Sequence, residues 1–213
     1  ILLQSYENIE VIIVDDFSTD QSLDIIKEFQ LKDARVRLFS LKKNSGRPAI
    51  PRNYGIEKSK GKFIAFMDSD DIWHRDKLST QLEVMARFSV DFCCTSSINF
   101  VNYCEISKKL FVCKNEVSFK KITHDNLLFK NTIPNSSVII LRKKLADFRF
   151  NEDVRYKAVE DYHLWLRLLQ HGLSAIKLDQ NLLYYRISET SISQYKFQML
   201  KKVFLLLGEY KVN

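Results

Sequence analysis

Glycine and proline are scarce in this sequence, which has five glycines and three prolines among its 213 residues. Low-complexity and disordered chains are usually rich in these residues, so the scarcity argues against both. No apolar run approaches the roughly 20 residues that a membrane-spanning helix needs. With 46% hydrophobic and 28% charged residues, the composition is that of a globular protein large enough to bury a core.

Two common site patterns are also absent. The glycines never form the Gly-x-Gly-x-x-Gly spacing of a nicotinamide dehydrogenase, which excludes that class. The four cysteines include no Cys-x-x-Cys pair, so a zinc site is not expected. Cys93 and Cys94 would point to opposite faces of a strand and act as small apolar residues. A Cys104–Cys113 bridge is an alternative to the reduced, cytoplasmic chain that we expect.

The charge balance is basic, with a formal net charge of +7 and an isoelectric point near 9.1. This favours an anionic partner, which could be a nucleotide, an anionic membrane surface or a nucleic acid. The basic residues are scattered rather than massed on one helix, and no nucleic-acid-binding signature is present. We therefore expect no nucleic-acid partner.

The most informative stretch is residues 62–73, with the sequence Lys-Phe-Ile-Ala-Phe-Met-Asp-Ser-Asp-Asp-Ile-Trp. Residues 63–67 form an apolar run of strand length, and Asp68, Asp70 and Asp71 follow it directly. Crowded carboxylates repel one another unless a cation or hydrogen-bond donors neutralise them. Oxygen ligands of this kind suit Mg²⁺ or Mn²⁺ with diphosphate oxygens, so the pattern predicts a metal–diphosphate site. The alternative is a solvated acidic turn before a helix.

Apolar periodicity predicts the remaining elements. Strands are expected at 9–14, 36–41, 91–101, 137–141, 173–178 and 182–187, with a hairpin over 103–119. Helices are expected at 22–31, 48–60, 75–88, 123–130, 159–170 and 193–210. The first half alternates strand and helix with crossover-length connections, which is typical of a parallel, nucleotide-binding α/β sheet.

Six short motifs occur in an order that resembles a known family. They are Gln4-Ser5-Tyr6, residues 10–16 with Ser18-Thr19-Asp20, Asn44-x-Gly46, Arg52-Asn53-x-Gly55-Ile56, residues 61–73, and Glu160-Asp161-Tyr162-x-Leu164-Trp165-Leu166. Together they resemble the inverting family-2 glycosyltransferases with the GT-A fold. The resemblance implies an α/β fold with one Rossmann-like domain, a mixed but mainly parallel central sheet, and helices on both faces.

The resemblance also implies roles at the donor site. Asp16 would hydrogen-bond the nucleotide base, with Asp15 supporting the same loop. Arg47 would contact the nucleotide, and either Arg47 or Arg52 could be the phosphate contact. Asp68 and Asp70 form the family's Asp-x-Asp pair, in which the first faces ribose and metal and the second binds the cation, Mn²⁺ or Mg²⁺. Asp71 would complete this nucleotide-sugar-binding group.

At the acceptor side, Asp161 resembles the catalytic base and Glu160 its neighbour, which could orient the acceptor. A carboxylate opposite the leaving group would take the acceptor proton as general base. The alternative for both residues is simple capping, because acidic side chains favour the first turn of a helix. The helix dipole would then lower the pKa of Asp161. Residues 184–186 resemble a late family loop near the acceptor or diphosphate.

The expected organisation is one glycosyltransferase domain over 1–192, with a donor half at 1–90, an acceptor half at 91–192, and an amphipathic helix at 193–213. The donor would be a nucleoside-diphosphate sugar, with a UDP-sugar favoured, and the acceptor a glycan or lipid-linked hydroxyl. We expect action in bacterial surface polysaccharide synthesis at the cytoplasmic face of the membrane, where the last helix could make peripheral contact. The alternative is a degenerate domain that binds without catalysis.

The family's usual first strand has no counterpart in the sequence. We expect roughly 25–35 further residues upstream, enough for a strand, a loop and a helix. Without them, the strand at 9–14 would have an exposed edge.

Overall fold

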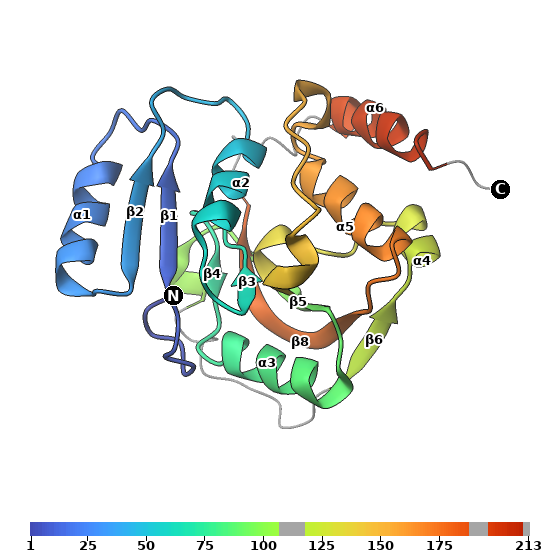
Figure 1. Ribbon diagram of the computed structural model, residues 1–213, viewed down its shortest axis with the longest axis horizontal. Coiled ribbons are helices and arrows are strands. Elements are labelled where there is room, and N and C mark those ends of the chain that lie inside the picture. The colour runs from blue at the N-terminus through green and yellow to red at the C-terminus, as the bar shows by residue number, and fades with distance from the viewer. Residues whose placement is uncertain (107–117, 188–195, 211–213) are drawn as a thin grey trace.

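The computed structural model describes residues 1–106, 118–187 and 196–210 (Figure 1). The strands are β1 (Val11–Asp15), β2 (Val36–Ser40), β3 (Phe63–Ala65), β4 (Ile72–Trp73), β5 (Phe92–Phe100), β6 (Phe119–Ile122), β7 (Ile139–Leu141) and β8 (Ala175–Arg186). The α-helices are α1 (Ser22–Lys32), α2 (Ala49–Lys58), α3 (Lys77–Phe88), α4 (His124–Phe129), α5 (Glu160–Gln170) and α6 (Lys196–Leu207). Short 3₁₀ turns are η1 (Tyr103–Glu105), η2 (Asn135–Ser137), η3 (Arg142–Leu145) and η4 (Val154–Tyr156).

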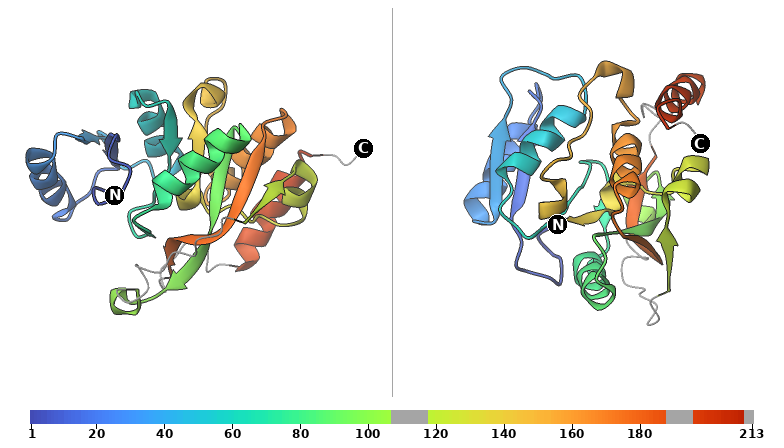
Figure 2. Two further views of the ribbon diagram at one scale, coloured as in Figure 1. Left: turned by 90° about the horizontal axis from the view of Figure 1, so that it is seen from below. Right: turned by 45° about the vertical axis from the view of Figure 1, so that its right-hand side comes forward.

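The strands form two sheets. β1 and β2 make a parallel pair, and with α1 they lie together at one end of the molecule (Figures 1 and 2). The other six strands form one sheet in the order β3-β7-β5-β8-β4, with β6 also paired to β8.

The six-stranded sheet is mixed, as predicted, but the prediction that the sheet is mainly parallel is wrong. The β5–β8 pairing is parallel, whereas β3–β7, β5–β7, β4–β8 and β6–β8 are all antiparallel. An apolar run predicts a buried strand but carries no information on the direction of its neighbour. The two late strands predicted at 173–178 and 182–187 are one continuous strand, β8. The predicted hairpin lies largely outside the described residues.

Helices cover both faces of this sheet, as predicted. On one face, Leu78 and Met85 of α3 pack with Cys93. On the other, α2 and α5 pack in one cluster with Phe92 and Cys94. Adjacent residues of β5 therefore enter opposite layers, which confirms the expected orientation of the two buried cysteines. The alternative bridge from Cys104 falls outside the description, because Cys113 is not among the described residues.

Helix α5 is the centre of the larger layer. Its Trp165 is fully buried and meets the rings of Phe66, Phe92 and Phe150 at centroid distances of 5.9, 6.0 and 6.1 Å. The helix ends at Gln170, as predicted, and Gly172 just beyond it has a left-handed φ of 78°.

The C-terminal turn of α5 is closed by two backbone hydrogen bonds. The N–H of Gly172 donates to Leu169 O at 3.0 Å, and that of Leu173 donates to Leu168 O at 3.1 Å. These are the two bonds of a Schellman motif, which satisfies carbonyls that would otherwise lack a donor.

Helix α6 lies beside α4, at the end of the molecule away from β1 and β2 (Figures 1 and 2). Its Leu206 is fully buried in the same cluster as Trp165. Among residues 1–106, 118–187 and 196–210, no helix combines the length and apolar character needed to cross a membrane.

Candidate active site

Arg52 of α2 joins two acidic motifs that are far apart in the sequence. Its Nη2 donates to Asp68 Oδ1 at 2.7 Å, and its Nη1 donates to Glu160 Oε1 at 2.7 Å. The side chains of Arg52 and Glu160 are only 16% and 4% exposed, so this part of the network is largely withdrawn from water. Burial alone would lower the pKa of Arg52, but the charges of Asp68, Glu160 and Asp161 outweigh it and raise the pKa. The acidic group after β3 and the start of α5 therefore form one site.

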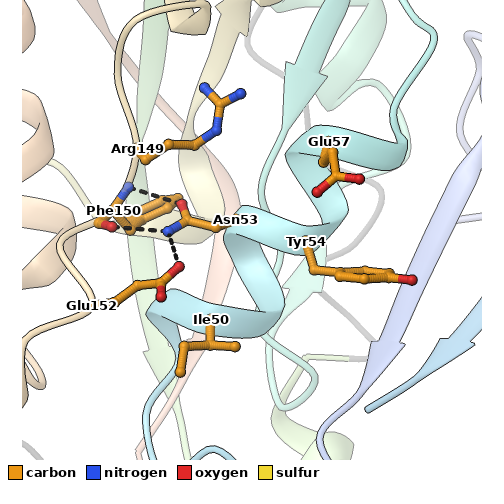
Figure 3. A pocket seen from close by; sticks show the side chains of 7 residues that line it. All are labelled: Ile50, Asn53, Tyr54, Glu57, Arg149, Phe150 and Glu152. Carbon is orange, nitrogen blue, oxygen red and sulfur yellow. Dashed lines mark hydrogen bonds between the residues drawn. The ribbon is translucent and has the colours of Figure 1, made fainter.

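Contacts with the 150–152 segment fix the position of Arg52 on α2. The guanidinium lies over the ring of Phe150, with Cζ 5.4 Å from the centroid. The next residue, Asn53, donates to Phe150 O at 2.9 Å and accepts from the Phe150 N–H at 2.9 Å. The Asn53 amide also donates to Glu152 (Figure 3). The Arg-Asn motif thus binds the 150–152 segment with one side chain and the carboxylates with the other.

Asp68 is held by the η2 turn, which the sequence analysis missed. Asn135 Nδ2 donates to Asp68 Oδ1 at 3.2 Å, and the Asp68 N–H donates to Ser136 Oγ at 3.0 Å. Trp73 Nε1 donates to Ser136 O at 2.7 Å from the other side of the acidic stretch. Asn135 and Ser136 are both buried. No recognised motif includes these two residues. The sequence Pro-Asn-Ser-Ser before a strand was the only local pattern that could have indicated a polar turn here.

Asp70 and Asp71 have different environments. Asp70 is exposed, whereas Asp71 is buried and accepts the Arg186 N–H on Oδ1 at 3.0 Å. The other oxygen of Asp71 is buried without a hydrogen-bond partner among the described residues. Burial raises the pKa of Asp71 to about 6, and the charges of Asp68 and Asp70 add to the shift.

Tyr185 on β8 lies near the whole acidic group. Burial raises the pKa of its phenol, and the charges of Asp71, Asp68, Asp70 and Asp161 raise it further. This places the late 184–186 segment beside the Asp-x-Asp pair and the start of α5.

Glu160 and Asp161 begin α5 after a strained residue. Ala158 has a left-handed φ of 75°, and its N–H donates to Glu160 Oε2 at 2.5 Å. Asp161 Oδ1 accepts from the Tyr162 N–H at 2.7 Å. Burial raises the pKa of Asp161 to about 7; the Glu160 charge adds to the shift and the Arg52 charge opposes it. The expectation of a lowered pKa was wrong, because burial and the like charge of Glu160 raise the pKa.

Asp161 also lines a cavity of about 260 Å³ between α4, α5 and α6. The walls come from three helices and the segments beside them, and their residues include Phe129, Met199, Val203 and Leu207. Asp161 therefore belongs both to the acidic group around Arg52 and to the lining of this cavity.

Asp15, Asp16 and Arg47 form a separate group at the carboxyl end of β1. Asp16 accepts from the Ser45 N–H and hydroxyl at 2.7 and 2.8 Å, while Asp15 is buried and accepts from Ser18 N–H at 3.1 Å. Arg47 donates from Nη1 to the Glu152 backbone oxygen. These contacts order the loops around β1, and Glu152, which accepts from both Arg47 and Asn53, links this group to the Arg-Asn motif.

A larger cavity of about 440 Å³ lies against a different face of α2 (Figure 3). Its lining comprises Ile50, Asn53, Tyr54, Glu57, Arg149, Phe150 and Glu152. Those residues include none of the carboxylates joined by Arg52, so the chemistry is expected beside Arg52 and not here. Within the residues that the structure describes, no cluster of three or more His, Cys, Asp or Glu side chains is already arranged around a metal position.

A mixed sheet covered by helices, with acidic groups after β1 and β3 and two more carboxylates at the start of α5, is the arrangement expected of the GT-A class of glycosyltransferase. The model of the family described as "Glycosyl transferase family 2" matches residues 1–149. The chain belongs to this family.

Curated relatives agree. The chain is 33% identical to the putative teichuronic acid biosynthesis glycosyltransferase TuaG of Bacillus subtilis, over 98% of this chain and 79% of that protein. It is 35% identical to WfgD of Escherichia coli, named a UDP-Glc:alpha-D-GlcNAc-diphosphoundecaprenol beta-1,3-glucosyltransferase, over 100% of this chain and 79% of that protein.

Solved structures agree on the fold. S. aureus TarS residues 1–349 with UDP-GlcNAc superposes with a TM-score of 0.74 at 20% identity, over 99% of this chain and 61% of that one. The mannosyltransferase PcManGT of Pyrobaculum calidifontis, in complex with GDP-Man and Mn²⁺, superposes with a TM-score of 0.71 at 15% identity, over 98% of this chain and 57% of that one. The chain therefore spans about 60% of the length of these solved chains, and the expected GT-A fold is confirmed.

Proposed function

We propose that this chain transfers a sugar, with inversion, from a nucleoside-diphosphate donor to a hydroxyl of a lipid-linked glycan in bacterial surface polysaccharide synthesis. The observation that carries the proposal is the pair of Arg52 hydrogen bonds, 2.7 Å each, to Asp68 and Glu160. They support a shared site for the donor-side acidic stretch and Asp161, a half-buried carboxyl whose pKa is raised to about 7 by desolvation and by the Glu160 charge. A general base is most effective when its pKa lies near the working pH.

The reaction assigns one task to each group. The acceptor oxygen attacks the anomeric carbon while the bond from that carbon to the diphosphate oxygen breaks. Asp161 takes the proton of the acceptor hydroxyl, and Glu160, held by Arg52, positions the start of α5. Arg52 also supplies positive charge beside the acidic stretch. Asp16 and Asp15 would hold the base, and Arg47 would contact the nucleotide.

The oxygen donors after β3 fit a divalent ion. Asp70 is exposed, and the side chain of Asp68, two residues before it, is 35% exposed. One carboxylate oxygen of Asp71 is buried without a hydrogen-bond partner among the described residues. Hard carboxylate oxygens are the ligands that Mg²⁺ and Mn²⁺ prefer. Asp70 and Asp68 would hold the ion, which when bound supplies Lewis-acid stabilisation of the leaving diphosphate.

The substrate classes follow from the relatives. UDP is favoured as the donor nucleotide because the name of WfgD contains UDP-Glc and the TarS structure contains UDP-GlcNAc. A lipid-linked acceptor is favoured because the same name contains a diphosphoundecaprenol. Such an acceptor would place the reaction at the cytoplasmic face of the membrane. In this scheme residues 1–90 would serve the donor and 91–192 the acceptor, with α6 beside them.

Metal-dependent hydrolysis of UDP-glucose and UDP-N-acetylglucosamine tests the proposal without a known acceptor. The wild type should release UDP with Mn²⁺ or Mg²⁺, and Asp70→Ala should lose most of that activity. Asp147→Ala, another exposed aspartate, is the matched control and should keep it. Nucleotide binding without any turnover would instead support the degenerate binding domain.

A further inference from the structure

Helices α4 and α6 together expose large apolar side chains at one end of the molecule. Phe129, at the end of α4, is 93% exposed, and Leu200 and Phe204 of α6 are 53% and 67% exposed. Leu200 and Phe204 are four residues apart, so they lie on the same face of α6. We call Phe129, Leu200 and Phe204 the α4–α6 surface. Large apolar side chains exposed on neighbouring helices mark a contact site more often than scattered single residues do.

This surface is continuous with the cavity beside Asp161. Phe129 belongs to both, and the α6 residues Met199 and Val203, which flank Leu200 and Phe204 in the sequence, line the cavity. Figures 1 and 2 place α4 and α6 next to each other, with α5 alongside. An apolar path therefore leads from the outside of the molecule to the carboxyl that we propose as the base.

The lysines around the α4–α6 surface favour an anionic partner. Lys130 follows Phe129 directly, and Lys201 and Lys202 lie between Leu200 and Phe204 in the sequence. Lys202 Nζ donates to Lys157 O at 2.6 Å, which fixes one ammonium beside the cavity. Lysines around exposed aromatic and aliphatic side chains complement the headgroups and acyl chains of an anionic bilayer. A second copy of this chain, with a net charge of +7, offers no such complement.

We propose that the α4–α6 surface docks on the interface of an anionic lipid bilayer. The inference deepens the proposed function and rests on it for the identity of the acceptor. Phe129, Leu200 and Phe204 enter the headgroup region, and the cavity then opens toward the membrane. A lipid-linked acceptor can reach Asp161 from there, while the nucleotide-sugar enters on the side of Asp68 and Arg52.

Vesicle flotation tests the docking directly, with the full chain and no acceptor. The vesicles are phosphatidylcholine alone, or phosphatidylcholine with about one-third phosphatidylglycerol. The wild type should float with the anionic vesicles and remain below the neutral ones. The double variant Phe129→Ser with Phe204→Ser should lower the floated fraction about fivefold or more, since each phenyl group contributes apolar burial in the interface. The matched double variant Leu3→Ser with Leu31→Ser removes residues that are 87% and 88% exposed, and it should float like the wild type.

Three results would overturn the proposal: no flotation of the wild type, equal flotation of the two double variants, or a dimer in sedimentation that the Phe129/Phe204 variant converts to a monomer. The last result would assign the surface to a second copy of the chain. Circular dichroism of both double variants verifies that each is folded. Donor hydrolysis by the wild type without vesicles keeps the two proposals separate. Hydrolysis without flotation would contradict the docking alone, and flotation without hydrolysis would contradict the proposed function alone.

Discussion

Nη1 of Arg52 lies 2.7 Å from Oε1 of Glu160, between residues that are 108 positions apart in the sequence. The same guanidinium holds Asp68 at 2.7 Å through Nη2. Removing one partner of a buried ion pair leaves the other charge without compensation, which costs far more than the loss of a surface pair. Arg52 is therefore expected to matter for folding as well as for the reaction.

Replacing Arg52 with Met should lower the free energy of unfolding by about 3 kcal/mol, because it leaves Glu160 buried and unpaired. The control is Arg155→Met, which removes a solvent-exposed pair with Asp153 and should leave the free energy of unfolding nearly unchanged. Urea denaturation at pH 7 measures both. If both variants lose the same free energy of unfolding, the Arg52 ion pairs stabilise the fold no more than a surface pair does.

The rate of transfer should rise as the pH passes through about 7, where the Asp161 carboxyl ionises in the folded chain. Asp161→Asn should lower transfer by about 100-fold or more at pH 8, because a general base typically contributes that much. Asp24→Asn changes an exposed carboxylate on α1 and should leave the profile intact. A flat profile between pH 5.5 and 8.5, measured with a lipid-linked acceptor of the WfgD type, would contradict the assignment of Asp161 as base.

The same carboxyl gives a stability prediction of defined sign. Its pKa is raised from the ordinary value of 3.8 to about 7, so the folded state holds this proton more tightly than the unfolded state does. The contribution to stability is complete below pH 3.8 and is lost as the pH rises toward 7. Asp161→Asn should therefore be more stable than the wild type at pH 8, by up to about 4 kcal/mol, with the gain vanishing near pH 4.

Urea midpoints at the two pH values measure this difference. Asp24→Asn should show the same difference from the wild type at both. If Asp161→Asn is less stable than the wild type at pH 8, the ionised carboxylate stabilises the folded state, and burial does not raise its pKa.

The turn before α5 stores backbone strain at Ala158, whose φ is 75°. Ala158→Gly relieves a left-handed Ala conformation and should raise the free energy of unfolding by about 0.5 kcal/mol, after the greater flexibility of unfolded glycine is subtracted. Ala146→Gly is the matched control, since Ala146 has right-handed helical angles. It should lose about 0.5–1 kcal/mol. If both variants are destabilised equally, the turn is not strained.

Several parts of the molecule were predictable from local pattern. The α5 stripe, its end at Gly172 and the strand before Asp68 each follow from spacing within one segment. The antiparallel pairings of β7 and β8 were not predictable, because a strand run carries no direction. The link from Asn135 to Asp68 and the raised pKa of Asp161 depend on distant segments meeting in space. Either Arg47 or Arg52 was expected to contact phosphate, but the hydrogen bond from Arg52 to Glu160 could not be predicted from the Arg-Asn motif alone.

The central claim is that the acidic stretch after β3 and the start of α5 serve one reaction. The most direct test is a crystal structure with UDP-glucose and Mn²⁺, with the metal located by its anomalous scattering. The account predicts an anomalous peak bonded to Asp70, with the sugar between that peak and Asp161. A peak elsewhere, or a nucleotide bound in the Ile50–Glu152 cavity with its sugar turned away from Asp161, would contradict it.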